Sequence, residues 1–162
     1  MRDIISRTLP ASLELSVIAL ALAAAVGLSI GFSGIARPEG KLDLAGRLYG
    51  LGTYALPPFW VAMLLQLLFA VSLGWLPVGG RFPPSLMPPE GTGFYLIDSI
   101  RNLDMTALKG TLRHLLLPAG TLALLLSGTF TTALRLNLRR TLRGDYAEAA
   151  RSRGLSLSLI HI

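Results

Sequence analysis

The chain has 162 residues, of which 52% are hydrophobic and only 15% are charged, and its mean hydropathy is +0.58. This balance is more apolar than that of a soluble globular domain, so the composition predicts an integral membrane protein. The chain has no cysteine, which excludes thiolate chemistry and cysteine-based metal sites from it. It also has no glycine-rich phosphate loop, which excludes an ATP-hydrolysing subunit.

Three stretches without a formal charge predict three transmembrane helices in an all-α fold. They are residues 15–36, 48–80 and 114–134, and each has the roughly 20 residues that a helix needs to cross the hydrocarbon core. We place the spans at about residues 12–36, 50–76 and 114–136. A signal peptide is the alternative for the first stretch, but its apolar run is too long and no clear cleavage site follows it before Arg37, which favours an uncleaved span.

Polar and proline residues mark the first two spans. Glu14, at the start of the first span, is expected to benefit from the helix dipole, and an ion pathway is the alternative. In the second span Pro57 and Pro58 remove two backbone donors, so the helix should break or kink there. Gln66 is the one amide in that span. An interhelical hydrogen bond is its favoured role, and contact with a transported solute is the alternative.

The loop at residues 77–113 is proline-rich at first, which predicts an extended, irregular segment. Apolar residues then recur at near-helical spacing, which predicts an amphipathic helix on the membrane surface. This helix would pack on the membrane face or contact a solute-binding protein. Its apolar residues are Phe94, Ile97, Ile100, Leu103 and Leu108.

Small and polar residues form a stripe on the third span, at Gly120, Ser127, Gly128 and Thr131. Their spacing of three and four residues puts them on one face of a helix, as close helix packing requires. Packing is the favoured role, and lining a translocation path is the alternative. Ser127 and Thr131, together with Gln66, are therefore the candidate residues of a substrate path.

The net charge of +6 is distributed unevenly between the two sides of the predicted membrane domain. Basic residues are denser in residues 37–47 and after the third span than in residues 1–14 and 77–113, so the positive-inside rule places the first pair of segments in the cytoplasm. The loop 77–113 is then extracytoplasmic. Because topology accounts for the charge, nucleic acid is not expected as a partner.

A short charged helix is predicted in the loop at residues 141–156, just beyond the third span. Asp145 can act as its N-cap, and Glu148, three residues later, can complete a capping box. Gly154 falls where a left-handed helix stop is expected. A helix of about two turns is marginal in water unless something packs on it. Its alanines would let a partner approach the backbone closely, so the segment predicts a docking element.

The sequence Glu148-Ala149-Ala150, followed after three residues by Gly154, resembles the EAA loop of permease subunits of binding-protein-dependent ABC importers. Further segments resemble the dipeptide, oligopeptide and nickel permease subfamily, so the likeness covers nearly the whole chain. That subfamily has an earlier span before this region and two more after it, so the chain resembles the middle of a six-span permease. The segments are Thr-Leu-Pro-Ala-Ser-Leu-Glu-Leu at 8–15, Pro-Pro-Phe-Trp at 57–60, Gly-Trp-Leu-Pro at 74–77 and His-Leu-Leu-Leu-Pro-Ala-Gly-Thr-Leu-Ala-Leu at 114–124.

The resemblance implies a transporter subunit of a prokaryotic inner membrane, in contact with lipid, rather than an enzyme. It implies no cofactor or metal, and as partners two ATP-binding subunits, a second permease subunit and an extracytoplasmic solute-binding protein. Short peptides are the favoured substrates, while nickel chelates and other small solutes stay open. The residues implied to couple the permease to the ATPase are Asp145, Glu148, Ala149, Ala150, Arg151, Arg153 and Gly154.

A secondary transporter or a non-transporting membrane scaffold is the alternative function. A carboxylate in mid-membrane would favour ion coupling, and none of the predicted spans has one. The last six residues, 157–162, match one reading frame of a transposon adapter used in DNA library preparation. We therefore expect the native sequence to stop near Ser156.

Overall fold

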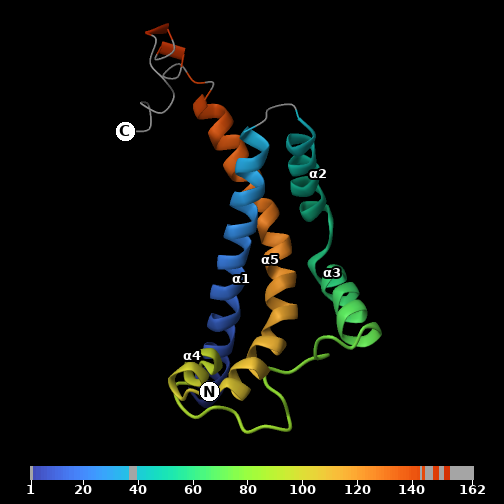
Figure 1. Ribbon diagram of the computed structural model, residues 1–162, viewed down its shortest axis with the longest axis vertical. Helices are drawn as coiled ribbons and strands as arrows, with labels where there is room; N and C mark the ends of the chain where they lie inside the picture. The colour runs from blue at the N-terminus through green and yellow to red at the C-terminus, as the bar shows by residue number, and fades with distance from the viewer. Residues whose placement is uncertain (1, 37–39, 143, 145–147, 150–151, 154–162) are drawn as a thin grey trace.

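The computed structural model describes residues 2–36, 40–142, 144, 148–149 and 152–153. All the regular structure in these residues is helical (Figure 1), which confirms the predicted all-α fold. The last six residues of the chain lie outside this described part. The helices are α1 (Arg2–Ala36), α2 (Lys41–Ala55), α3 (Pro58–Leu65), the π-helix η1 (Gln66–Ser72), α4 (Tyr95–Arg101) and α5 (Met105–Leu142).

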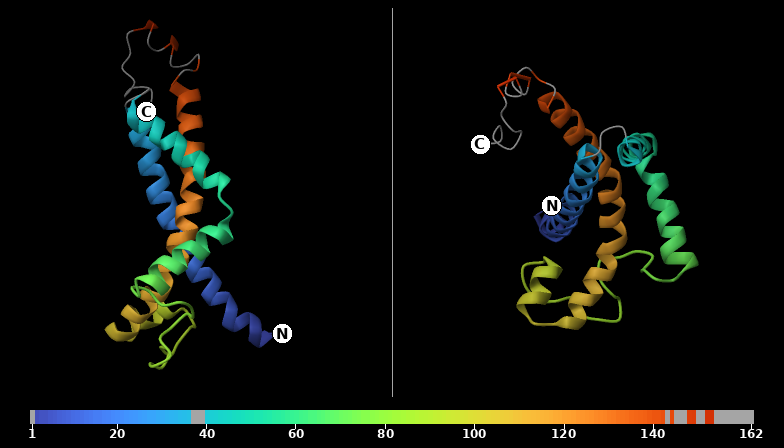
Figure 2. Two further views of the ribbon diagram at one scale, coloured as in Figure 1. Left: turned by 90° about the vertical axis from the view of Figure 1, so that its right-hand side faces the viewer. Right: turned by 45° about the horizontal axis from the view of Figure 1, so that its top comes forward.

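Helices α1 and α5 lie side by side along the long axis of the molecule (Figures 1 and 2). Their contact is close because α1 presents small residues four positions apart, among them Ala19, Ala23 and Gly27. Both alanines are almost fully buried. A Cβ at Gly27 would lie only 2.5 Å from the backbone oxygen of Ser127. Small side chains therefore set the distance between the two helices.

The predicted second span is a bent pair of helices. The chain bends by 100° between α2 and the segment Pro58–Ser72, which contains α3 and η1. The break falls at Leu56 and Pro57, both of which have extended backbone angles. A proline disfavours the helical conformation in the residue before it and cannot donate its own N–H, so the expected break at the two prolines is confirmed. Residues 41–47, which the sequence places before the second span, belong to α2.

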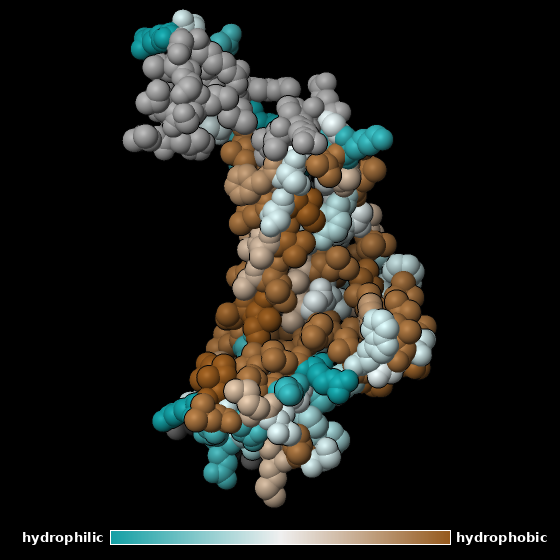
Figure 3. All heavy atoms as spheres, viewed as in Figure 1, coloured by the Kyte–Doolittle hydropathy of each residue, from teal (hydrophilic) through white to brown (hydrophobic). Residues whose placement is uncertain are grey.

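Helices α1 and α5 are each long and apolar enough to cross a membrane, over Thr8–Gly34 and Met105–Thr141. The α2–α3 pair makes a third crossing if it counts as one broken span. Figure 3 shows hydrophobic side chains along the middle of the visible face and polar residues near its ends. Exposed leucines and valines such as Val17, Leu20 and Val71 belong to this apolar surface, which suits contact with lipid or with further helices.

The predicted amphipathic helix in the loop is divided in two. Helix α4 ends at Arg101, and Leu103 has a positive φ of 54° that turns the chain. Helix α5 then begins at Met105, well before the predicted start at residue 114. Its beginning is fixed by Asp104, whose Oδ1 accepts hydrogen bonds from the N–H groups of Thr106 and Ala107 at 2.9 Å. Leu108 is therefore part of α5 rather than of the surface helix.

Glu14 was expected to interact with the N-terminus of its own helix, and this prediction is wrong because α1 begins at Arg2. The carboxylate caps a different helix. Its Oε1 accepts the Leu96 N–H at 2.6 Å in the first turn of α4, and its Oε2 accepts from Arg81 Nη2 at 2.9 Å. Arg81 also lies 3.9 Å from the centre of the Tyr95 ring. Glu14 thus attaches α4 and the preceding loop to α1.

Asp98 organises the loop before α4. It is fully buried and accepts hydrogen bonds from the N–H and hydroxyl of Thr92 and from the N–H of Gly93, at 2.9–3.0 Å. Burial by itself raises the pKa of this carboxyl, but the hydrogen bonds to its charged form outweigh burial and lower the pKa below its ordinary value. The ionised carboxylate therefore holds the loop in place.

Replacing Gly27 by alanine should destabilise the detergent-solubilised protein by about 1–3 kcal/mol, because the added Cβ overlaps the backbone of α5. The measurement is the midpoint of thermal unfolding. Gly120→Ala is the matched control, since a Cβ at that α5 position meets nothing within 4 Å. Equal midpoints for the two variants would show that the helices are not packed at Gly27 as described.

Replacing Asp98 by asparagine should open the loop at neutral pH. Hydrogen bonds to a charged group contribute about 1.5–3 kcal/mol, so the Thr92 and Gly93 amides should exchange with deuterium roughly ten- to a hundredfold faster. Glu90→Gln, at an exposed loop position, is the control and should leave the exchange unchanged.

The wild-type protein should show the corresponding dependence on pH. The pKa of Asp98 is lower in the folded protein than its ordinary value of 3.8. Its stabilising effect is therefore complete above that value and is lost as the pH falls through the folded pKa. If the Thr92 and Gly93 amides still exchange slowly with deuterium in Asp98→Asn, the role of the carboxylate is contradicted.

Candidate functional site

The candidate site lies at the end of the molecule where α1 finishes, α2 begins and α5 finishes, which we call the basic end. The described residues of the loop 141–156 continue from α5 beyond it, and α4 lies at the opposite end (Figures 1 and 2). The start of α2 and the end of α5 thus share one side of the molecule, as the predicted three-span arrangement requires.

A fully buried carboxylate, Asp43, is the centre of the basic end. It is shared by Arg47 of its own helix and by Arg135 and Arg139 of α5. Arg47 Nη2 lies 2.5 Å from Oδ2, Arg139 Nη2 lies 2.7 Å from both carboxylate oxygens, and Arg135 Nη2 donates to Oδ1. We call these four residues the Asp43 cluster.

Helix geometry explains why these residue types meet here. Asp43 is in the first turn of α2, where a negative charge is favoured by the helix dipole, and Arg139 is in the last turn of α5, where a positive charge is favoured. Arg47 follows Asp43 by one helical turn, and Arg139 follows Arg135 by one turn, so each pair shares a helix face. A buried carboxylate is strongly unfavourable unless it is paired in this way.

Two glycines make room for the most deeply buried arginine. The Arg135 side chain is only 6% exposed. Its Nη1 atom occupies the space where a Cβ would lie at Gly34 of α1, and it would lie 2.7 Å from a Cβ at Gly46 of α2. This atom has no hydrogen-bond partner in the described part of the chain. The guanidinium group therefore contacts α1 and α2 at once, through positions that lack side chains.

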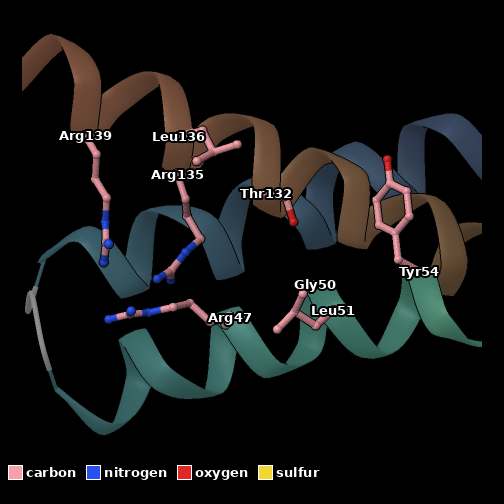
Figure 4. A pocket seen from close by; sticks show the side chains of 9 residues that line it. Arg47, Gly50, Leu51, Tyr54, Thr132, Arg135, Leu136 and Arg139 are labelled. Carbon is pink, nitrogen blue, oxygen red and sulfur yellow. The ribbon is translucent and has the colours of Figure 1, made fainter.

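A cavity of about 270 Å³ lies between α2 and α5 beside the cluster (Figure 4). Figure 4 shows the three arginine side chains gathered at one end of it, with Thr132 and Tyr54 further along. This volume is at the lower limit of small-molecule pockets, which are typically 300–1,000 Å³, and it is too small to enclose a short peptide. Its lining residues are Gly46, Arg47, Gly50, Leu51, Tyr54, Thr132, Arg135, Leu136 and Arg139.

Ser127 and Thr131, two predicted path residues, lie together on the buried face of α5 and are fully buried. The Ser127 hydroxyl is 2.6 Å from the hydroxyl of Tyr49 on α2, and the Thr131 hydroxyl donates to the backbone oxygen of Gly27 on α1 at 3.1 Å. Both side chains therefore connect α5 to its neighbours. Gly120 was expected on the same packing face, and it is instead exposed.

Gln66, the third predicted path residue, lies apart from these two, on η1. Its side-chain amide donates to the backbone oxygen of Val78 in the following loop at 2.6 Å. The expectation of an interhelical hydrogen bond was wrong, because η1 ends at Ser72 and the chain then turns back toward its own last turns.

The predicted coupling residues are described only in part. Glu148, Ala149 and Arg153 are exposed, as a docking surface requires. The Glu148 N–H donates to the Gly144 oxygen at 3.2 Å, which is the spacing of a helical turn. The other predicted coupling residues, Asp145, Ala150, Arg151 and Gly154, lie outside the described residues, and so does the proposed capping box.

The sequence interpretation did not find the Asp43 cluster. It treated Arg47, Arg135 and Arg139 only as charges that report topology. A signal was present in the two pairs spaced by four residues, Asp43 with Arg47 and Arg135 with Arg139. Such spacing places both members on one helix face, but it does not reveal that the two faces meet.

Residues 23–160 match the family model of the binding-protein-dependent transport system inner membrane component. The chain belongs to this family. It is 35% identical over 147 residues to the di/tripeptide transport system permease protein DppB of Pseudomonas aeruginosa. The aligned region covers 91% of this chain and 44% of the relative. No solved structure matches the chain.

Two further relatives come from Escherichia coli K12. The probable D,D-dipeptide transport system permease protein DdpB is 35% identical over 147 residues, covering 90% of this chain and 43% of the relative. The putrescine export system permease protein SapB is 34% identical over 151 residues, covering 91% and 47%. The chain thus spans less than half the length of these relatives.

Family membership confirms the resemblance found in the sequence. The match shows a multi-pass protein of the bacterial inner membrane. Its apolar helices agree with that location.

Proposed function

We propose that the intact protein is the membrane-spanning permease subunit of an ATP-driven importer for short peptides. Its partners are two ATP-binding subunits, a second permease subunit and an extracytoplasmic solute-binding protein. The observation that carries this proposal is the family match over residues 23–160, together with relatives named as di/tripeptide and D,D-dipeptide permeases.

Putrescine is a second candidate solute, because the SapB relative is named for putrescine export. A small cation and a short peptide differ in charge and in backbone hydrogen-bonding groups, so competition in an uptake assay separates them. A secondary transporter is less favoured. The buried carboxylates of α1 and α2, Glu14 and Asp43, are both paired with arginine, which leaves neither free to carry a coupling ion.

Coupling to the ATPase is assigned to the loop 141–156. The exposed side chains of Glu148, Ala149 and Arg153 support this assignment, because they combine charge with a small residue that allows close approach. The basic end then faces the cytoplasm, where the positive-inside rule places dense arginines. The permease contributes binding energy and a change of conformation rather than covalent chemistry.

The path of the solute is assigned to the region of the broken helix. Because Pro57 and Pro58 have no N–H, the backbone oxygens of Thr53 and Tyr54 lack their usual helical donors. Transporters use such interrupted helices to present backbone groups to a solute. Ser127 and Thr131 would reach a solute only if α1, α2 and α5 separated. Gln66, half-buried on η1, stays a candidate without such a separation.

The proposed topology predicts which positions react with a membrane-impermeant thiol reagent in intact cells. Single cysteines at the exposed positions Glu90 and Arg140 test it, since the chain has no cysteine of its own. The cysteine at position 90 should be labelled in intact cells, and the one at position 140 only after permeabilisation. The reverse pattern would invert the topology and remove the loop 141–156 from the ATPase.

Glu148→Lys in the full-length permease should weaken binding of the ATPase subunit at least tenfold, because it reverses a charge at the proposed interface. The measurements are co-purification of the ATPase and substrate-stimulated ATP hydrolysis in proteoliposomes. Asn137→Lys is the control. It adds a positive charge at an exposed position of α5 outside the loop, and it should behave as wild type. Normal coupling in Glu148→Lys would contradict the assigned role of the loop.

A further inference from the structure

We propose that Asp43 is a positioning residue for energy coupling: it fixes α2 to α5 at the basic end, so that the two helices move together when the coupling loop is displaced. This inference rests on the proposed function, because it concerns how movement at the ATPase reaches the membrane helices. It assigns a role to a cluster that lies outside the loop itself.

The two arginines of α5 hold the carboxylate from two successive turns. Arg139 reaches both oxygens of Asp43 at 2.7 Å, and Arg135 donates to Oδ1 from one turn earlier. Contacts from two turns restrict sliding and rotation of α2 against α5 more than one contact does. The carboxylate is fully buried, so an arginine that moves away would leave part of a buried charge unpaired, which is strongly unfavourable.

The cluster also contacts the end of α1. Gly34 and Gly46 leave space for the Arg135 guanidinium between α1 and α2, and a side chain at either position would overlap it. The ends of three helices therefore meet at one guanidinium group. Because interiors are close-packed, such a contact transmits displacement rather than absorbing it.

Helix α5 connects the cluster directly to the coupling loop. It continues without a break from Arg135 to Leu142, so a displacement of the loop moves Arg139 as well. Helix α2 carries the displacement away from the basic end, and the 100° bend with α3 lies at its other end. Movement of the loop thus reaches the broken helix, where the solute path is proposed, through Asp43.

The geometry favours this mechanical role over an anion-binding role for the three arginines. All three donate to Asp43. The Arg135 Nη1 atom, which is buried and has no hydrogen-bond partner in the described chain, lies between two glycines, so a ligand in the cavity cannot reach it without separating the helices.

The first test is Asp43→Asn in the full-length permease, assembled with its ATPase and binding protein in proteoliposomes. Asparagine keeps the size of the side chain and removes its charge. The ATPase should still co-purify and hydrolyse ATP, while the amount of peptide taken up per ATP should fall at least tenfold. Equal uptake per ATP in wild type and Asp43→Asn would overturn the inference.

The second test replaces the ion pairs by a disulfide. A Cβ at Gly50 of α2 would lie 3.9 Å from the Cβ of Thr132 on α5, within the 3.5–4.5 Å range of disulfides. The pair Gly50→Cys with Thr132→Cys should therefore form a bond when oxidised. In the Asp43→Asn background this bond should restore uptake per ATP, and reduction should abolish the rescue. Failure of the bond to rescue would overturn the mechanical role.

The same cysteine pair gives a test that does not depend on Asp43→Asn. In the wild-type background, oxidation should leave uptake unchanged, because α2 and α5 are expected to stay together through the cycle. Inhibition by the disulfide, but not by either single cysteine, would overturn the inference. The proposed function fails separately, if the wild-type permease neither binds an ATPase nor takes up peptide.

Discussion

The ion pairs of Asp43 are the interaction on which the basic end depends. A carboxylate is removed from water there, and it is stable only because guanidinium groups from α2 and α5 surround it. Pairing of this kind favours one register, since a shift of α2 against α5 would move Asp43 away from Arg135 and Arg139 and leave it only Arg47 of its own helix. Small residues make the same arrangement possible on the α1 side, where Gly34 leaves space for Arg135.

At the opposite end of the molecule, buried carboxylates are also stabilised by pairing, here with an arginine and with backbone N–H groups. Glu14 of α1 pairs with Arg81 and caps α4, while Asp98 holds the preceding loop through backbone N–H groups. Between the two polar ends the helices pack through alanine, glycine and short hydroxyl side chains. In a membrane, where apolar side chains gain little by leaving lipid, close contact of small residues and hydrogen bonds between helices are what hold such a bundle together.

The chain spans less than half of the relatives it matches, which bears on its exposed apolar surface. Helix α3 and η1 present many large hydrophobic side chains, including Phe59, Met63 and Leu67. Contact with lipid or with other membrane helices would cover this surface. The break before α3 frees backbone oxygens, which in a membrane need donors from neighbouring helices or from a water-filled cavity.

The sequence by itself determined the class of the protein, its apolar helices, the break at Pro57 and the family, because hydropathy, proline chemistry and motif spacing are local properties. Only the tertiary structure decided which charges meet. Glu14 caps a helix some 80 residues away in sequence, and Asp43 meets arginines of α5 more than 90 residues away. No periodicity within a helix encodes these pairs, since they depend on the register between helices. Helix α5 also starts earlier than its apolar stretch suggests, because Asp104 caps it from the loop.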